Sequence, residues 1–161
     1  MTFLDEVAAA LVRAGRSLEV DPALSTIDVS SASAEQVLAV VRPVARAVTF
    51  YVVHPVLVPA VAVAGVSELV VRATADLVDA ALELDLATGA VAVRFGVVLG
   101  ELELPEDELA ELLDAALDTV ETAAQQYAGA IDDVLAGADP RTASTAVRRA
   151  PVEELAAELD G

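Results

Sequence analysis

His54, the single histidine of the chain, is the residue whose type permits the widest range of chemistry. A histidine can serve as the general base of a Ser-His-Asp triad or ligate a metal ion, and both roles need partners that orient the ring. His54 stands beside Pro55 inside a long uncharged segment, with no acidic residue close to it in the sequence. We therefore interpret it as a turn or core histidine, and we expect no catalytic residue.

Clustered carboxylates are the next candidates, because Ca²⁺ and Mg²⁺ prefer several carboxylate oxygens. The clusters are Glu101 with Glu103, residues 106–108, and Asp132, Asp133 and Asp139. None has the D-x-D-x-D-G spacing of a calcium loop, and the glycines follow neither phosphate-binding pattern. Solvated acidic faces are the simpler interpretation, so we expect no metal site and no cofactor.

A row of acidic residues lies along one face of a predicted helix and is a candidate interaction surface. Glu111, Asp114, Asp118, Glu121 and Gln125 follow one another at spacings of three or four residues, which places them on one helix face. Like charges at these spacings weaken an isolated helix by roughly 0.2–0.5 kcal/mol per pair. Packing of the opposite face, bound cations or a basic partner would each offset this cost. The row is therefore either a solvated face or an acidic interaction surface.

The helix that carries this row is predicted from Pro105 to Gly137. Pro105 suits a first helical position, and the acidic residues at 106–108 suit a first turn. Its apolar stripe would be about 45 Å long, more than a domain of this size covers by itself, so we expect part of it to pack on another chain. The candidate interaction surface combines this stripe with the acidic row: Leu109, Leu113, Ala116, Val120, Tyr127, Ile131, Glu111, Asp114, Asp118 and Glu121.

Local signals predict the elements that must position this helix. Thr2 with Asp5 resembles a capping box, and Gly15 suits the end of that first helix. Val37 to Val41 has an apolar helical spacing, with Ser33 as its cap and Pro43 as its end. The remaining elements are predicted as strands at 17–20, 26–30, 47–54 and 56–64, a helix at 67–78, and a hairpin at 82–99 that turns at Thr88 and Gly89.

The uncharged run from Ala47 to Val66 is long enough to cross a bilayer. Pro55, Pro59 and His54 interrupt it, and its valine-rich composition suits strands covered on both faces. We therefore favour buried strands over a membrane helix.

Composition limits the class of protein. The 161 residues suit one domain, with 27 acidic against 9 basic residues and a net charge of −18. A phosphate backbone needs a basic surface, so nucleic acid is not an expected partner. No cysteine is present, and acidic residues follow Met1 where a signal peptide has basic ones, so we expect a cytoplasmic protein. We expect one domain over 1–139, then a linker and short helix over 140–161.

The stretch from Val66 to about Gly137 resembles the YbjN family and the related type III secretion chaperones. A helix leads into LELDLATGAVAVRFGVVL, and GELELPEDELAELLDAAL opens the final helix. The resemblance implies an α+β fold, with a twisted antiparallel sheet packed against helices and a long C-terminal amphipathic helix, in a small, acidic, dimeric protein. Secretion chaperones of this kind bind segments of partner proteins and are not enzymes, so the resemblance implies no catalytic residues.

The sequence supports two hypotheses. The first is a non-enzymatic, homodimeric acidic domain that binds a protein or a basic segment, in a chaperone-like or regulatory role. The second is a structural or housekeeping protein of a halophile, whose acidity is adaptation to salt.

Overall fold

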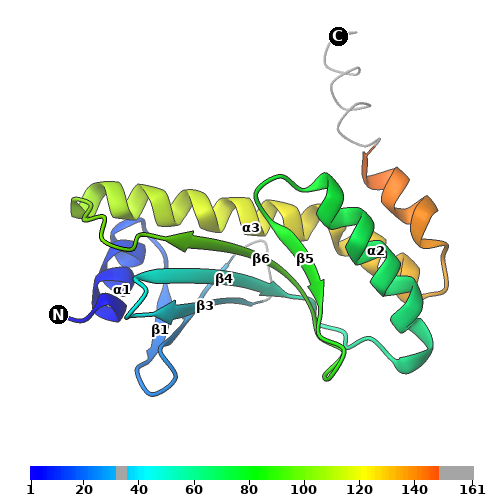
Figure 1. Cartoon of the computed structure of the whole chain (residues 1–161), viewed down its shortest axis with the longest axis horizontal. Coiled ribbons are helices and arrows are strands. Elements are labelled where there is room, and N and C mark those ends of the chain that lie inside the picture. The colour runs from blue at the N-terminus through cyan, green and yellow to red at the C-terminus, as the bar shows by residue number, and fades with distance from the viewer. Residues whose placement is uncertain (32–35, 149–161) are drawn as a thin grey trace, which may run out of the picture.

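The computed structural model describes residues 1–31 and 36–148, and its centre is one six-stranded antiparallel sheet (Figure 1). The strand order is β1-β2-β3-β4-β6-β5. The predicted α+β fold is confirmed. The strands are β1 (Leu18–Asp21), β2 (Thr26–Val29), β3 (Val37–Arg42), β4 (Ala47–Val53), β5 (Ala81–Leu84) and β6 (Val91–Val98).

Helix α1 (Phe3–Arg13) begins and ends as its sequence predicts. The Thr2 hydroxyl accepts from the Asp5 amide, and the Asp5 carboxylate accepts from the Thr2 amide at 2.7 Å. Hydrogen bonds from the backbone and side chain of Thr2 lower the pKa of Asp5. Gly15 follows the helix with φ +86°, a left-handed conformation that turns the chain toward β1.

The helix predicted over Val37 to Val41 is wrong, because this segment is strand β3. Val37, Ala39 and Val41 are buried while the residues between them are half-buried, which is the two-residue period of a strand. A run this rich in valine fits both periods, and pairing with β2 and β4 decides between them. Pro43 therefore begins a tight turn between two strands.

The strand predicted over 56–64 is also wrong. A single 3₁₀ turn (Ala60–Ala62) leads directly into α2 (Val63–Asp76), which begins four residues before the predicted cap at Ser67. Pro55 and Pro59 lack the amide hydrogens that a strand would donate, and β4 already pairs with β3 and β6. The predicted strand over 47–54 corresponds to β4.

The hairpin of β5 and β6 is confirmed, and its turn is built around two residues. The Asp85 carbonyl accepts from the Gly89 amide at 2.7 Å, and the Asp85 carboxylate accepts from the Thr88 hydroxyl at 2.8 Å. Gly89 has φ +79°, and its carbonyl accepts from the Val58 amide at 2.8 Å. The hairpin turn is therefore fastened to the segment that leads into α2.

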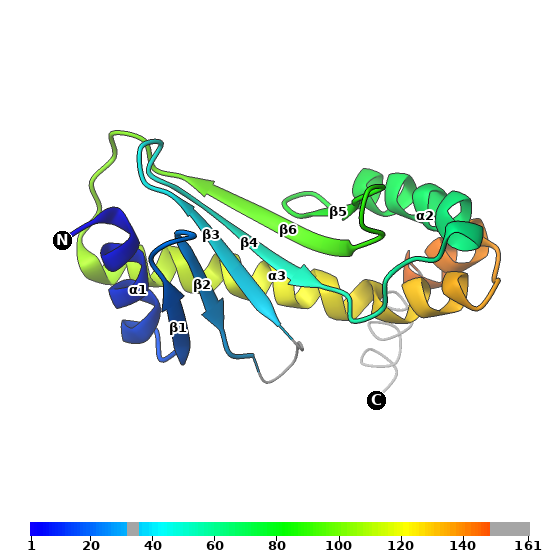
Figure 2. The same cartoon turned by 90° about the horizontal axis from the view of Figure 1, so that it is seen from below.

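Helix α3 (Glu106–Leu135) runs along one face of the sheet, with Pro105 just before its first residue. That face carries the buried alternate residues of the central strands, including Phe50, Val52 and Val93. In Figure 2, β3, β4 and β6 lie in front of α3, and no described helix crosses in front of these three strands. The core therefore lies between α3 and one sheet face, while the opposite face of the central strands is open.

After α3, residues 140–148 form a helix where the sequence predicted the start of a linker. The Asp139 carboxylate caps it by accepting from the amide and hydroxyl of Thr142 at 2.9 and 2.8 Å. Ala143 and Val147 are buried in the core. The short helix predicted near 151–159 lies outside the described residues. No helix within the described part of the chain is long and apolar enough to span a membrane.

Candidate functional site

The apolar stripe of α3 lies inside its own chain. Leu113 and Val120 have no exposed surface, and the other four predicted stripe residues are at most 6% exposed. Those four are Leu109, Ala116, Tyr127 and Ile131. The whole length of α3 is covered within the chain, by α1, the sheet, α2 and the helix at 140–148 (Figure 1). The prediction that this helix is too long for one small domain to cover is therefore wrong. A contact with a second chain must therefore use other residues or uncover these.

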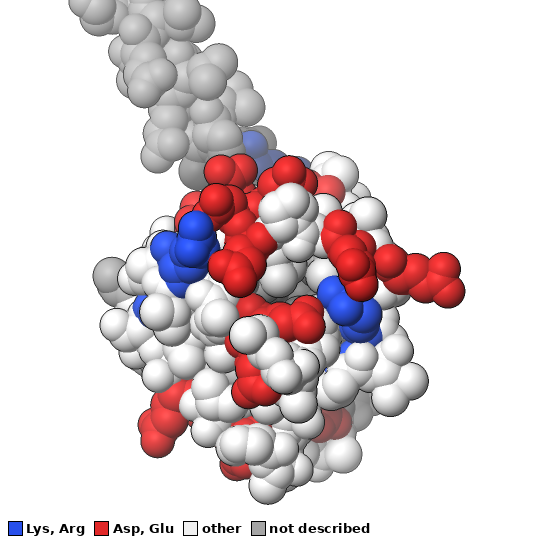
Figure 3. Space-filling view, turned by 90° about the vertical axis from the view of Figure 1, so that its left-hand side faces the viewer, with Lys and Arg blue, Asp and Glu red and all other residues white. Residues whose placement is uncertain are grey.

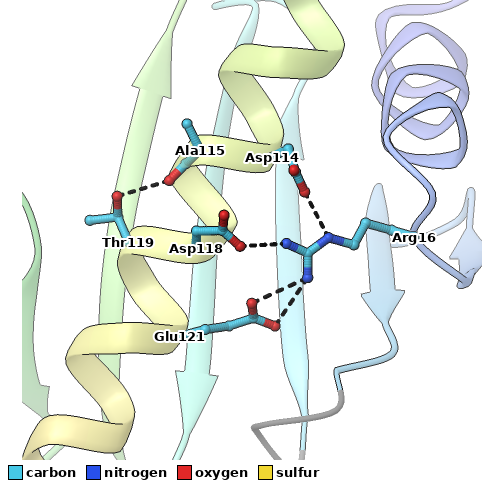
Figure 4. A network of polar contacts seen from close by, with 6 residues as sticks. All are labelled: Arg16, Asp114, Ala115, Asp118, Thr119 and Glu121. Carbon is cyan, nitrogen blue, oxygen red and sulfur yellow. Dashed lines mark hydrogen bonds and ion pairs between the residues drawn. The ribbon is translucent and has the colours of Figure 1, made fainter.

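Three of the four acidic candidates on α3 converge on one basic residue of the same chain, Arg16 (Figure 4). Its Nε lies 2.8 Å from Asp114 Oδ1, its Nη2 2.7 Å from Asp118 Oδ1, and its Nη1 3.2 Å from Glu121 Oε2. The Glu121 side chain is only 9% exposed, and that of Arg16 is 19% exposed. The repulsion between these carboxylates is therefore offset by a cation of the same chain.

Local structure brings Arg16 to this position. The left-handed Gly15 ends α1 and turns the chain, so that the next side chain extends across α3. Burial opposes the charge of Arg16, but hydrogen bonds from its guanidinium to Asp114 and Glu121 outweigh burial and raise its pKa above the ordinary value. Arg16 therefore links α1 to the middle of α3 as a permanent cation.

Other acidic residues remain exposed at the end of the molecule where α3 begins. Arg13 pairs there with Glu106 and Asp107, and all three side chains are more than half exposed. Glu101, Glu103, Glu108 and Glu111 are also exposed. Figure 3 looks onto this end and shows acidic side chains gathered around a few arginines. We call Glu101, Glu103, Glu106, Asp107, Glu108 and Glu111 the acidic end.

A pocket lies within the acidic end, between α1 and the start of α3. Its volume is about 320 Å³, and its lining includes the apolar Ala10, Leu104 and Leu109 together with Glu6, Glu106 and Arg13. The Glu6 carboxylate is 3.3 Å from Arg46 Nη2. This pocket combines an apolar floor with carboxylates, which suits an apolar side chain next to a basic one.

The open face of the sheet has the opposite character. The middle positions of β3 and β4 carry the uncharged Leu38, Val40, Thr49, Tyr51 and Val53. Charged side chains of the same face lie on the flanking strands, with Asp28 registered beside Leu38 and Arg94 beside Tyr51. Cross-strand pairing places Leu38 and Tyr51 side by side, and Val40 beside Thr49. We call the five uncharged residues the neutral sheet face. No described helix crosses in front of β3 and β4 on this side of the sheet (Figure 2).

Sequence reasoning missed a partner of His54. The ring Nε2 lies 3.1 Å from Oδ1 of Asp132, which is 78 residues away in the sequence. The Val56 amide lies 3.2 Å from Nδ1, so a neutral ring protonated on Nε2 can accept from Val56 and donate to Asp132. The His54 side chain is 8% exposed, in keeping with the predicted turn or core histidine.

A second cavity, of about 380 Å³, lies beside this pair between the sheet and the second half of α3. Val52, Leu82 and Val93 of the sheet form one wall, and Ala124 and Ala128 of α3 lie opposite. Among the described residues that line the cavity there is no serine, threonine, cysteine or lysine, so none of them offers the His54–Asp132 pair a nucleophile to activate.

The acidic clusters do not form a metal site in the part of the chain that the structure describes. Within residues 1–31 and 36–148, no three histidine, aspartate or glutamate side chains converge as metal ligands would. Asp139 caps a helix, and its pKa is lowered by the Thr142 backbone and hydroxyl. Asp132 faces His54.

These features define an acidic α+β protein with an open antiparallel sheet and a long helix across its inner face. No protein-family model matches the chain, and no curated protein sequence matches it. Among solved structures it is similar to the crystal structure of YbjN from E. coli, described as a candidate transcription regulator. The TM-score is 0.62 at 11% sequence identity, and the match covers 77% of this chain and 89% of the YbjN chain. The expected resemblance to YbjN is confirmed for the fold.

Proposed function

We propose that this chain is a non-enzymatic, homodimeric regulatory protein that binds a basic segment of a partner protein. The observation that carries the proposal is the segregation of charge over the surface. The neutral sheet face carries uncharged side chains, while the acidic end holds six exposed carboxylates, of which Glu106 lines a pocket. Solvation alone requires acidic residues somewhere on the surface, but it does not require them to gather at one end of the molecule beside a pocket with an apolar floor.

The acidic end is the proposed site for the partner. Arg13 is the basic residue that pairs with Glu106 and Asp107, so most of the carboxylates there keep their charge available. A partner segment with an apolar residue between arginines or lysines would place that residue in the 320 Å³ pocket and its cations on the rim. Electrostatic attraction by a chain of net charge −18 would speed the encounter.

The charge of this chain favours a protein partner over a nucleic acid. YbjN is described as a candidate transcription regulator, which names a role and not a contact with DNA. A surface with 27 acidic and 9 basic residues repels a phosphate backbone. We therefore propose that regulation by this chain, in the cytoplasm, proceeds through a basic protein segment, and a chaperone-like role would use the same contact.

The test is binding of a short fluorescent peptide in which one leucine is flanked by arginines, measured by anisotropy. We expect saturable binding that weakens steeply as KCl is raised, because the charges involved are exposed. Glu106→Gln should weaken binding by roughly threefold, as loss of one exposed charge pair does. Asp133→Asn is the matched control, because it removes one exposed charge at the far end of α3 and should leave the affinity unchanged.

Two results would contradict the proposal. Absence of peptide binding at low salt would contradict the assignment of the acidic end as a partner site. Equal weakening by Glu106→Gln and Asp133→Asn would mean that the peptide senses only net charge. Salt adaptation, the other hypothesis for the acidity, predicts no peptide binding together with strong thermal stabilisation by molar KCl.

A further inference from the structure

The 380 Å³ cavity beside His54 and Asp132 has no part in the proposed function. Asp132 lies 26 residues along α3 from Glu106, which corresponds to about 39 Å along the helix. A partner bound at the acidic end would therefore not reach it. Its volume falls in the range of about 300–1,000 Å³ that is usual for small-molecule pockets, and is well above the roughly 150 Å³ that suffices for benzene.

Two alanines of α3 leave the space of the cavity, beside the large buried side chains of Tyr127 and Ile131, of which Ile131 also lines it. In the first half of the helix, Leu113, Leu117 and Val120 face the core and fill the space against the sheet. In the second half, Ala124 and Ala128, one helical turn apart, line the cavity. Small residues there leave apolar space between α3 and the strands, where larger ones would close it.

Three polar side chains, His54, Gln125 and Asp132, are among the residues that line the cavity. Asp132 has a side chain that is 65% exposed, so the cavity meets solvent on that side, and Gln125 on the same helix is also exposed. His54 is held between the Val56 amide and Asp132, and its nearly buried ring forms part of the wall. One oxygen of Asp132 is used by His54, which leaves the other available to a ligand.

This arrangement selects the chemical class of the ligand. The walls are aliphatic, so the body of the ligand must be apolar. The carboxylate at the mouth is unfavourable for an anion and favourable for an ammonium group, and the net charge of −18 acts in the same sense. We propose that the cavity is a binding site for a small amphiphilic cation, with its apolar body between α3 and the sheet and its N–H donors on Asp132.

The test uses 2-phenylethylammonium as the probe, with 2-phenylethanol and phenylacetate as neutral and anionic analogues. Because the chain has one histidine, its imidazole Cε1–H gives a single NMR signal next to the cavity. At fixed pH we expect a saturable shift of this signal with the ammonium probe, a several-fold weaker affinity for the alcohol, and no saturable shift with the carboxylate. Asp132→Asn should remove the preference for the cation over the alcohol.

Ala128→Leu should fill the cavity and abolish the saturable shift, while thermal melts check that the variant stays folded. Ala115→Leu is the matched control, because the same change is made on the exposed side of α3 and should leave binding intact. Absence of a saturable shift with all three probes would overturn the proposal. So would a shift that persists in Ala128→Leu, since it would report counterions on an acidic surface, or equal affinity for the ammonium and the carboxylate.

Discussion

Arg16 determines the charge balance of the middle of α3. Its guanidinium contacts Asp114, Asp118 and Glu121, which follow one another on one face of α3 at spacings of four and three residues. Glu121 is the member that matters most for stability, because its side chain is buried while Asp118 is largely exposed. Removing the cation would leave a buried carboxylate without a compensating charge.

We therefore expect Arg16→Ala to lower the free energy of unfolding by about 2–3 kcal/mol, below the roughly 3–5 kcal/mol of a fully buried pair because water reaches part of this network. Urea unfolding followed by circular dichroism measures the change. Adding Glu121→Gln to Arg16→Ala should recover part of the loss, because a neutral amide costs less to bury than an unpaired carboxylate.

Arg13→Ala is the matched control for this change. Arg13 also extends from the end of α1 to acidic residues of α3, but its pairs with Glu106 and Asp107 are exposed to water. Exposed pairs contribute little, so this variant should stay close to the parent protein in stability. Equal losses in Arg13→Ala and Arg16→Ala would show that burial of Glu121 does not set the energy of the network.

At the scale of elements, the turn of the β5–β6 hairpin is the most constrained connection. A Cβ at Gly89 would lie 2.8 Å from the Val58 carbonyl oxygen, which is backbone and cannot rotate away. Gly89→Ala also places a side chain at φ +79°. We expect a loss of about 2–4 kcal/mol, since left-handed strain alone costs roughly 1–2 kcal/mol and the collision adds to it.

Gly100→Ala separates strain from collision. Gly100 has φ +57°, and a Cβ there would meet nothing within 4 Å, so this variant should lose only the roughly 1–2 kcal/mol of the left-handed backbone. The losses of stability in the two variants can be compared from their midpoints of urea unfolding, provided that the slope of the free energy of unfolding against urea concentration is unchanged. A Gly89→Ala loss no larger than that of Gly100→Ala would mean that the contact with Val58 is readily relaxed.

The elements that could be predicted from the sequence are those with local signals. Helix α1, the β5–β6 hairpin and α3 have local signals: a capping box, a strict alternation around a glycine turn, and a stripe repeated over many turns. The segments at 37–41 and 56–64 lack such signals, because runs of valine and alanine fit several periods. Strand pairing made the first segment a strand, and the second could not pair beside β4, because β3 and β6 already occupy both sides of that strand.

The candidate sites depend on distance along the chain in the same way. The acidic row of α3 could be predicted, because its members lie within a few turns of one helix. Its cation Arg16 could not, since it is separated from Asp114 by 98 residues. The partner of His54 is likewise 78 residues away, and nothing in the local sequence marks Asp132 as different from the acidic residues around it.

For the whole molecule, net charge limits how two copies can meet. Each chain carries −18, so contact between acidic ends would bring like charges together. The neutral sheet face brings fewer charges together and offers Leu38, Val40, Tyr51 and Val53 for burial, with Asp28 and Arg94 on the strands beside them. A two-fold axis through this face would pair each patch with its own copy, so every substitution there is present twice at the interface. We therefore propose that the dimer forms through the neutral sheet face.

Light scattering should then give a dimer of the parent protein at micromolar concentrations. Val40→Glu should give a folded monomer, with the dimer weakened by about 100-fold or more, because two unpaired carboxylates would be buried against each other. Val44→Glu is the matched control: Val44 lies in the β3–β4 turn with its side chain fully exposed, so it adds the same charge away from the sheet face and should leave the dimer intact. A monomeric parent protein would remove the dimer from the proposed function. Dimers of equal stability in both variants would show that the interface lies on another surface. The contact to test next would be the apolar stripe of α3, by measuring whether the buried Tyr127 becomes exposed to solvent.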